Sequence, residues 1–414
     1  MQDRARITAL LARARDGGAR AAEALRVETQ LLEQVSARRP AVSRVELRWT
    51  VRVWGEGGRA GTGAAEDPDA ALAQAFVAMK AAAPSAVAGP ADRYAIRAGG
   101  NGIDDPRFPG VTDADRADIL VSAERAMQAA PVRRRGVRLR QGRSRRAWMS
   151  TRGVEAEEHG TCFEIFAEAD LGDVELDQRL ASRHFADVAS LPFGPELRRR
   201  LDLHARPGPL PAAPLPWVLE PRAVGGLLMS LGEAFVGDGR TFVDDLPDGR
   251  LAPSIVHVTD DPARFAGLHT CAFDDRGVPP IAVTLVREGL AHGRYHAPED
   301  ARDAGLRPTG HFRDGCLRPA NPALRPGSRT RNMILAELGE HVSIERLPAV
   351  DRRTGLVSGV ALGVLVRGGE RVSGVRVPLS EHVTTLLARA TEVAGDQERV
   401  NAADASSLVL APAR

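Results

Sequence analysis

Apolar positions in the first part of the chain recur with two different periods, which predict helices in some segments and strands in others. The first segment has the spacing of a helix, and its buried positions would be Ile7, Leu10, Leu11 and Ala14. Gly17 and Gly18 follow and would end this helix. Apolar and polar residues then alternate over 45–53, which predicts a half-buried strand.

Two further helices are predicted before the middle of the chain. Asp67 is a good N-cap and Pro68 suits the first helical position, so a helix is expected from there until Pro84. Its inward stripe would consist of Leu72, Ala75, Phe76 and Met79. The other helix is expected from Asp113, and it would bury Ile119, Ala123 and Met127.

The segments around these helices have different patterns. The stretch "GEGGRAGTG" predicts a glycine-rich turn, and because no P-loop lysine follows it, a phosphate-binding loop is not expected there. Residues 87–112 have the pattern of a loop, and strand-like patterns resume over 132–170.

A proline-rich segment gives the clearest boundary in the chain. Five prolines within "ARPGPLPAAPLP" (205–216) predict a stiff, extended linker before a C-terminal domain over 217–414. Before the linker we expect an N-terminal α/β domain over 1–112, in which helices flank a sheet. A middle α/β region over 113–204 is expected to pack against it.

The C-terminal domain is predicted to contain mostly antiparallel strands and a few helices. Residues 220–240 have helical spacing and would bury Val224, Leu227, Leu228, Leu231 and Phe235. A hairpin is expected with Gly368 and Gly369 at its tip. A last helix would begin after Ser380 as N-cap and end at Gly395, with Val383, Leu386, Leu387 and Ala390 facing inward. The whole chain is therefore expected to have an α+β fold.

Composition narrows the class of protein. Of the 414 residues, 43% are hydrophobic, which is enough for sizeable cores, and no apolar run approaches the length of a membrane span. The N-terminus has an amphipathic pattern without the apolar segment of a signal peptide, so we expect a cytoplasmic protein without a membrane partner. Three cysteines in a chain this long do not indicate a disulfide framework.

Charge gives little support for nucleic-acid binding. The formal net charge is +2, and Lys80 is the only lysine, so arginine supplies almost all positive charge. The densest basic segment is "VRRRGVRLRQGRSRR" (132–146). It favours an edge or surface strand with solvated arginines. A phosphate-binding strip is the alternative, but no aromatic residues interleave with the arginines to stack on bases.

A window rich in histidine and cysteine raises the question of a metal site. Residues 269–316 hold six of the thirteen His and Cys residues of the chain: His269, Cys271, His292, His296, His311 and Cys316. His292 and His296 are four residues apart, the spacing at which one helix face offers two imidazoles to zinc.

Local sequence argues against a zinc helix in this window. Glycines flank His292, and Pro298 follows His296 closely, so the helix is expected to begin after the pair. Gly293 also stands where a hydrolytic H-E-x-x-H motif would carry its general base. Polar residues lining a groove or an interface are the favoured interpretation, and metal binding remains the alternative.

The order of several motifs resembles the TldD/PmbA family, whose paired subunits form a cytoplasmic metallopeptidase. The N-terminal resemblance lies in "VRVWGEGGRAGTGAAEDPDAALAQA" and "MSTRGVEAEE". The C-terminal resemblance is more specific. It comprises "AFDDRGVPP" (272–280), "TLVREGLAHGRYHAPEDARDAGLRPTGHFR" (284–313) with its Thr-Gly element, "PGSRTRNMIL" and the closing hairpin with the helix expected after it.

The resemblance implies that this chain is a metal-free, TldE-like subunit. Catalytic members carry H-E-x-x-x-H on the helix that opens the C-terminal domain, and here Met229, Ser230 and Ala234 stand at those positions. Such side chains neither bind zinc as imidazole does nor activate water as a carboxylate does. No catalytic residue, metal or other cofactor is therefore expected in this chain, and a TldD-like partner would supply the zinc.

The resemblance further implies that the subunit forms one wall of a chamber for peptides or peptide-like precursors. The candidates for this wall are Asp274, Asp275, Gly277, Thr309 and Gly310, although the two aspartates would equally suit a turn that caps a neighbouring strand. Arg276 departs from the family, which usually has an acidic residue there. Two alternatives remain: an independent metal-dependent hydrolase that uses 269–316, and a nucleic-acid-associated regulator.

Overall fold

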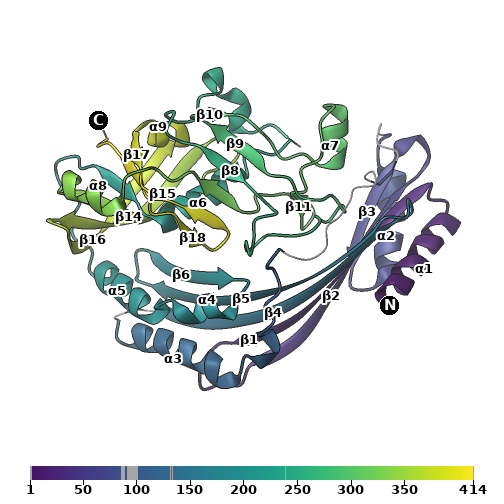
Figure 1. Cartoon of the computed structure of the whole chain (residues 1–414), viewed down its shortest axis with the longest axis horizontal. Helices are drawn as coiled ribbons and strands as arrows, with labels where there is room; N and C mark the ends of the chain where they lie inside the picture. Colours follow the sequence, from purple (N-terminus) through teal and green to yellow (C-terminus); the bar gives the residue numbers. More distant parts are fainter. Residues whose placement is uncertain are drawn as a thin grey trace.

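The N-terminal half is built on one long, curved sheet. The computed structural model describes residues 2–84, 89–90, 101–130, 132, 134–237 and 239–413. Six strands follow one another in the order β3-β2-β1-β4-β5-β6, and every pair is antiparallel. Their bounds are β1 Ala21–Gln34, β2 Val42–Trp54, β3 Ala60–Ala65, β4 Arg134–Ser150, β5 Glu155–Asp170 and β6 Glu175–Ser182. Figure 1 shows this sheet arching around the C-terminal half.

Helices cover the outer face of this sheet. They are α1 Gln2–Asp16, α2 Pro68–Ala81, α3 Asp113–Gln128, α4 Phe185–Ser190 and α5 Phe193–Ala205. The predicted stripe of α1 is confirmed in full, and Asp67 caps α2 by accepting a hydrogen bond from the Ala70 amide at 2.7 Å. In α2 the two predicted positions nearest the C-terminal end, Phe76 and Met79, are only partly buried, and the helix ends at Ala81 rather than Pro84.

The glycine-rich segment forms more than a turn. Its first glycines make a tight turn, but residues 60–65 form the edge strand β3. Helix α2 crosses this strand so closely that a Cβ at Gly63 would lie 2.0 Å from the Ala71 carbonyl oxygen. Glycine is therefore needed for helix-to-sheet contact, which the sequence pattern alone did not separate from a need for turning.

The arginine-rich segment is not an edge strand, although several of its arginine side chains are partly exposed as expected for a surface strand. Strand β4 lies in the middle of the sheet, hydrogen-bonded to β1 on one side and to β5 on the other. Several of the arginines are accommodated because they pair with carboxylates on neighbouring elements. Arg140 pairs with Glu33, and Arg145 pairs with Glu157.

The C-terminal half contains two mixed six-stranded sheets. One has the order β10-β9-β8-β13-β19-β18, the other β16-β15-β14-β7-β20-β17, and β11 and β12 form a small separate hairpin. The strand bounds are β7 Trp217–Leu219, β8 Val258–Asp260, β9 Val283–Arg287, β10 Leu290–Ala291, β11 Phe312–Arg313, β12 Cys316–Leu317, β13 Pro322–Leu324, β14 His341–Arg346, β15 Leu356–Arg367, β16 Glu370–His382, β17 Ala390–Val393, β18 Glu398–Val400, β19 Ala403–Ala405 and β20 Leu408–Leu410.

Helix α6 (Pro221–Gly232) packs against strands of both C-terminal sheets. All five of its predicted core residues are buried, although Phe235 lies beyond the end of the helix. The other helices are α7 Pro298–Asp303, α8 Arg331–Leu338 and α9 Val383–Ala388. None of the helices in the described part of the chain is long and apolar enough to cross a membrane. The α+β fold is confirmed.

Two predictions near the C-terminus have opposite outcomes. The hairpin is confirmed, since Gly368 and Gly369 connect β15 and β16 with φ values of 57° and 81°. The long helix after Ser380 is wrong, because strand β16 continues through Ser380 to His382. His382 caps the short helix α9, and the chain then enters β17 well before Gly395.

A buried carboxylate joins the outer helix layer to the C-terminal half. Glu345 on β14 is 1% exposed and contacts Arg200 and His204 of α5 at 3.1 and 3.0 Å. Arg371 of β16 approaches it at 2.9 Å. Burial alone would raise the pKa of Glu345, but the hydrogen bond with His204 and the charge of Arg200 hold that pKa well below its ordinary value.

We predict that Glu345→Gln lowers the free energy of unfolding by about 3 kcal/mol at pH 7, because it leaves buried cations without their carboxylate. A depressed carboxyl pKa contributes stability above the unfolded value of 4.5, and this contribution is lost as the pH falls further. The difference between parent and variant should therefore shrink in acid. Urea titrations at pH 7 and pH 4 measure both effects.

Glu340→Gln is the matched control for this measurement. Glu340 precedes the same strand and pairs with Arg367, but the two side chains are 41% and 57% exposed. Its loss should change the free energy of unfolding by less than about 0.5 kcal/mol. Equal effects of the two substitutions would contradict a joining role for Glu345.

Candidate functional site

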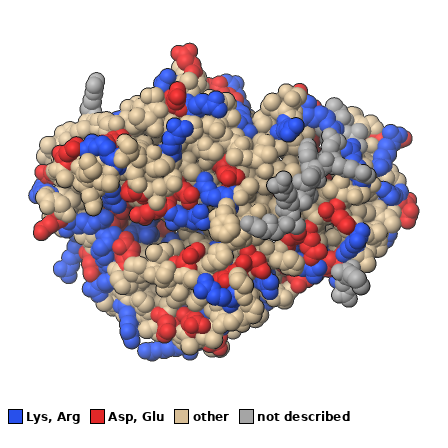
Figure 2. Space-filling view, viewed as in Figure 1, with Lys and Arg blue, Asp and Glu red and all other residues tan. Residues whose placement is uncertain are grey.

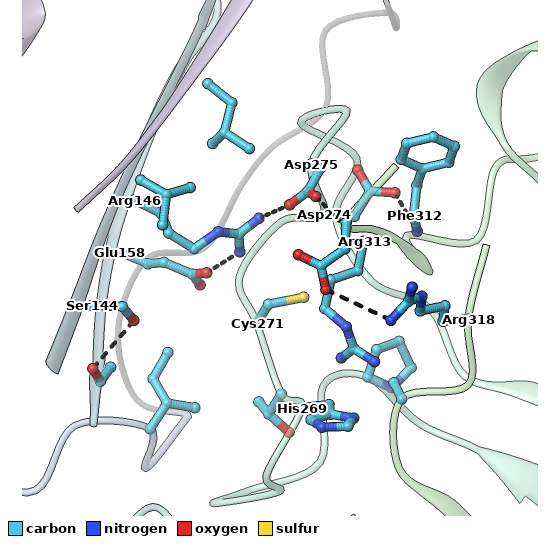
Figure 3. A pocket seen from close by; sticks show the side chains of 18 of the residues that line it. Ser144, Arg146, Glu158, His269, Cys271, Asp274, Asp275, Phe312, Arg313 and Arg318 are labelled. Atoms are coloured by element: carbon cyan, nitrogen blue, oxygen red, sulfur yellow. Dashed lines mark hydrogen bonds and ion pairs between the residues drawn. The ribbon is translucent and has the colours of Figure 1, made fainter. Parts of the chain in front are cut away.

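A cavity of about 370 Å³ lies between the inner face of the N-terminal sheet and loops of the C-terminal half. Strands β1, β2, β4 and β5 supply one wall, and residues 268–275 and 310–320 supply much of the other. Figure 3 shows the side chains that converge on it. Volumes of this size are typical of small-ligand sites.

Arg146 connects the two walls. Its guanidinium donates to Asp275 at 2.7 Å and to the Phe273 carbonyl oxygen at 3.0 Å, and it also pairs with Glu158 of β5. Burial would lower the pKa of Arg146, but the two carboxylates raise it, so the guanidinium stays charged. Phe273 and Ala272 pack beside this bridge against Leu25 and Trp148 of the sheet. The loop is thereby held on the sheet.

The carboxylate of Asp274, a predicted wall residue, is occupied by hydrogen bonds from nearby backbone amides. It accepts backbone hydrogen bonds from Arg276, Val278 and Phe312 at 2.8, 3.0 and 3.1 Å. Burial raises the pKa of Asp274 to about 7 against the effect of these donors. The side chain lies at the cavity wall, and its bonds match the turn-capping alternative.

Of the other predicted wall residues, two line the cavity and two lie behind its wall. Asp275 and Gly310 line the cavity, whereas Gly277 and Thr309 do not. Gly277 has φ +70°, and a Cβ there would lie 2.5 Å from the Trp148 ring. The Thr309 hydroxyl accepts a hydrogen bond from the His296 amide at 3.0 Å. These two residues therefore shape the loops behind the wall.

The inner end of the cavity contains groups that sequence reasoning did not bring together. His269 and Cys271 belong to the window noted above, but Arg183 and Arg313 were not singled out. Burial, with the nearby charge of Arg313, lowers the pKa of His269 to about 3. Burial raises the pKa of Cys271 to about 12, so both side chains are neutral near pH 7.

The histidine pair does not lie on a helix. His292 is exposed in the turn after β10, His296 is half-buried, and α7 begins at Pro298 as predicted. Among the residues that the structure describes, no group of three or more His, Cys, Asp or Glu side chains is placed to hold a metal ion. The Nδ1 atom of His296 has no hydrogen-bond partner within the described part of the chain.

Arg276, where the sequence departs from the family, has two carboxylate partners of its own. It contacts Glu23 of β1 and Glu299 of α7, each at 2.8 Å. Burial raises the pKa of Glu23 to about 7, although Arg276 opposes this shift. The arginine therefore fills a structural position between the sheet and the C-terminal half, and an acidic residue here would face two carboxylates.

The side chains at the three family-motif positions, on α6 and just after it, make only structural contacts. Met229 packs with Ala181, Leu268 and Ala402. The Ser230 hydroxyl donates to the Gly226 and Leu227 carbonyl oxygens of its own helix, at 3.1 and 3.2 Å. Ala234 is fully buried and lies two residues after the helix ends.

Arginines and carboxylates are also mixed on the surface. On the face shown in Figure 2, blue and red side chains are interspersed over both halves of the molecule. This distribution agrees with the pairing found along β4, where Arg143 contacts Asp104 at 3.1 Å. Paired arginines attract phosphate less than a free basic strip does.

Comparison with known proteins identifies a known domain in the C-terminal half of the chain. Residues 213–413 match the PmbA/TldA metallopeptidase C-terminal domain. A search of curated proteins found no match. A proposed modulator of DNA gyrase from Bacteroides thetaiotaomicron has 15% identity and a TM-score of 0.81, with 99% of this chain and 98% of that chain covered.

Two other solved structures are similar over nearly the same length. A proposed modulator of DNA gyrase from Thermotoga maritima has 19% identity and a TM-score of 0.74, with 98% of this chain and 97% of that chain covered. TldE from Thermococcus kodakarensis has 17% identity and a TM-score of 0.77, with 98% of both chains covered. These structures share the fold of the whole chain. The family match therefore covers the C-terminal domain of the chain, and the similarity to the solved structures shows the fold of the whole chain.

We predict that the thiols of Cys271 and Cys162 react slowly with iodoacetamide at pH 8, because burial raises both pKa values and the thiolate is the reactive form. For Cys271, a pKa of about 12 in place of 9.0 implies a rate lower by on the order of a thousandfold. Mass spectrometry of tryptic peptides measures each rate. The chain unfolded in guanidinium is the reference, and equal folded and unfolded rates for Cys271 would show a solvated thiol.

Proposed function

We propose that this chain is a TldE-like, metal-free subunit of a heteromeric TldD/TldE zinc metallopeptidase. It would form part of the substrate chamber, while a TldD-like partner holds zinc and carries out the chemistry. The observation that carries this proposal is the state of α6. At the positions of H-E-x-x-x-H in catalytic members, Met229 packs in an apolar cluster, Ser230 hydrogen-bonds to its own helix and Ala234 is buried beyond the helix end.

The side chains at the three motif positions cannot form a zinc site. Met229 contributes its thioether to an apolar cluster, and Ser230 hydrogen-bonds to its own helix. Ala234 lies after the last helical turn, so the second ligand position no longer shares a helix face with the first. Zinc hydrolases require imidazole or carboxylate ligands and a general base, and these positions provide neither.

In the proposed complex, zinc in the partner polarises the scissile carbonyl and generates the attacking hydroxide. This subunit supplies the walls described above, with Arg146 and Asp274 holding the loop that faces the sheet. Substrates would be peptides or peptide-like precursors, and cytoplasmic processing in natural-product biosynthesis is the proposed setting. The resemblance of fold to TldE supports this assignment over the alternatives.

The two alternative functions have less support. An independent hydrolase would need the His and Cys window to assemble a centre, but His292 is exposed and apart from the cavity that His269 lines. A nucleic-acid regulator would need basic charge without partners, whereas four arginines of β4 are paired with carboxylates: Arg140, Arg143, Arg145 and Arg146.

We expect the purified chain alone to contain substoichiometric zinc and to leave a casein-derived peptide mixture uncut. Co-expression with the TldD-like chain encoded beside it should yield a stable complex with zinc and peptidase activity, and phenanthroline should abolish that activity. Metal analysis, size-exclusion chromatography and mass spectrometry of products give the three readouts.

His292→Ala/His296→Ala is the matched control. In the proposed complex these histidines hold no metal, so the double variant should keep the zinc content and the peptidase rate of the parent complex within about twofold. The proposal fails if the isolated chain binds one zinc ion that this double substitution removes. It also fails if the isolated chain cleaves peptides at the rate of the complex.

A further inference from the structure

The cavity has an exposed mouth and a buried floor. At the mouth, the Arg48 and Asp314 side chains are 52% and 55% exposed, and Arg318 is 47% exposed. At the floor, Thr270 is 1% exposed and Leu268 is 6% exposed. A ligand that enters past the charged rim would therefore meet the floor with its leading end.

Arg313 stands near this floor with most of its hydrogen-bonding capacity unused. It follows Phe312 in the β11–β12 hairpin, whose turn at Asp314 and Gly315 has φ values of 52° and 88°. Its side chain extends past Cys271 toward His269 (Figure 3). Of its five N–H groups, one donates to the Pro319 carbonyl oxygen at 3.1 Å, and no described residue takes another.

Arg313 differs from the fully buried arginines of this chain. Arg26, Arg116, Arg200 and Arg276 each form an ion pair with at least one carboxylate, as buried guanidiniums usually must. No carboxylate of the described residues forms such a pair with Arg313. Burial lowers its pKa from the ordinary value, which indicates that its charge lacks full compensation.

A second guanidinium strengthens the positive potential at the floor. Arg183 donates to the carbonyl oxygens of Thr161 and Thr270, at 3.1 and 3.0 Å, but has no carboxylate partner among the described residues. Its hydrogen bonds hold the floor loop, so we assign it a structural role. The charges of Arg183 and Arg313 both act on His269, which remains neutral.

We propose that Arg313 anchors a carboxylate of the bound ligand, and that this carboxylate is the C-terminal end of a peptide. The planar guanidinium matches a carboxylate with two parallel hydrogen bonds. This proposal rests on the proposed function in one respect, namely that the ligand is a peptide. The peptide would enter with its C-terminus toward the floor and extend back through the mouth.

Charge favours a carboxylate over a phosphate at this position. The neutral His269 and Cys271 side chains add no further positive charge beside Arg313. Asp275 and Asp314 lie close enough to act electrostatically on Arg313. These two carboxylates would repel a dianionic ligand more strongly than a monoanionic one. The charges around Arg313 therefore favour a monoanion.

The test measures peptide binding to the isolated, full-length chain. The probes are an N-terminally fluorescein-labelled alanine pentapeptide with a free C-terminal carboxylate and the same peptide with a C-terminal amide. Fluorescence polarisation should show at least about tenfold tighter binding of the free acid, since a charge-assisted hydrogen-bond pair is lost on amidation.

Substitutions at Arg313 assign this preference to one side chain. Arg313→Met should reduce binding of the free acid to the level of the amide, and Arg313→Lys should give an intermediate affinity because it keeps the charge without the planar fork. Arg307→Met is the matched control, since Arg307 is exposed and lies outside the cavity lining. It should bind both peptides as the parent does.

Thermal unfolding separates ligand binding from a structural role of Arg313. Replacing a poorly compensated charge by methionine should leave the melting temperature within about 2 °C of the parent or raise it. A fall beyond this range together with weaker binding would overturn the proposal. Equal binding of acid and amide, absence of binding by both at millimolar concentration, or displacement of the peptide by phosphate at lower concentrations than by acetate would also overturn it.

These outcomes are independent of the partner. If the free acid is preferred but no complex with a TldD-like chain forms, only the assignment as an accessory subunit fails. If the complex is an active zinc peptidase but the acid and the amide bind equally, only the role of Arg313 fails.

Discussion

One guanidinium, that of Arg146, is shared by the two halves of the molecule that form the walls of the cavity. It lies on the inner face of the central strand β4 and contacts Glu158 on β5 and Asp275 on a C-terminal loop. Without it, two partly desolvated carboxylates would face each other across the junction, and the loss would be larger than that of a surface ion pair. The loop from 272 to 278 would then lose one of the contacts that hold it on the sheet, beside the pair of Arg276 with Glu23 and the packing of Phe273.

The long antiparallel sheet explains how so many charges are tolerated near this junction. Alternate residues of β4 point to opposite faces, so Leu139 and Ala147 pack beneath the outer helices while Ser144 and Arg146 face the cavity. A cation on the inner face can meet a carboxylate on the neighbouring strand at the same register. The pairing Arg146↔Glu158 across β4 and β5 is such a case.

Sequence periodicity predicted an element correctly where one of its faces is apolar. It failed where pairing with neighbouring strands determines whether the segment is a helix or a strand. Helices α1 and α6 were predicted with their buried residues because their apolar stripes are continuous. Strand β1 received no assignment: its alanine, glutamate, leucine and glutamine residues favour helix by themselves, and two flanking strands hold it extended. Ser380 has the chemistry of an N-cap, but its pairing with Ser358 in β15 keeps it in a strand.

Only part of the candidate site could be identified from the sequence, because the roles of the other residues depend on their tertiary partners. Asp274, Asp275 and Gly310 were found because they occur in motifs, whereas Arg183 and Arg313 carry no local signal in a chain with 56 basic residues, nearly all arginine. Arg313 has no carboxylate partner among the described residues and, unlike Arg183, which donates to three carbonyl oxygens, it donates to only one, and such partners are set by tertiary structure. A buried charge without compensation lowers stability, so it is expected mainly where a ligand completes the pair. The same criterion gives Arg276 a structural role, because Glu23 and Glu299 already compensate its charge.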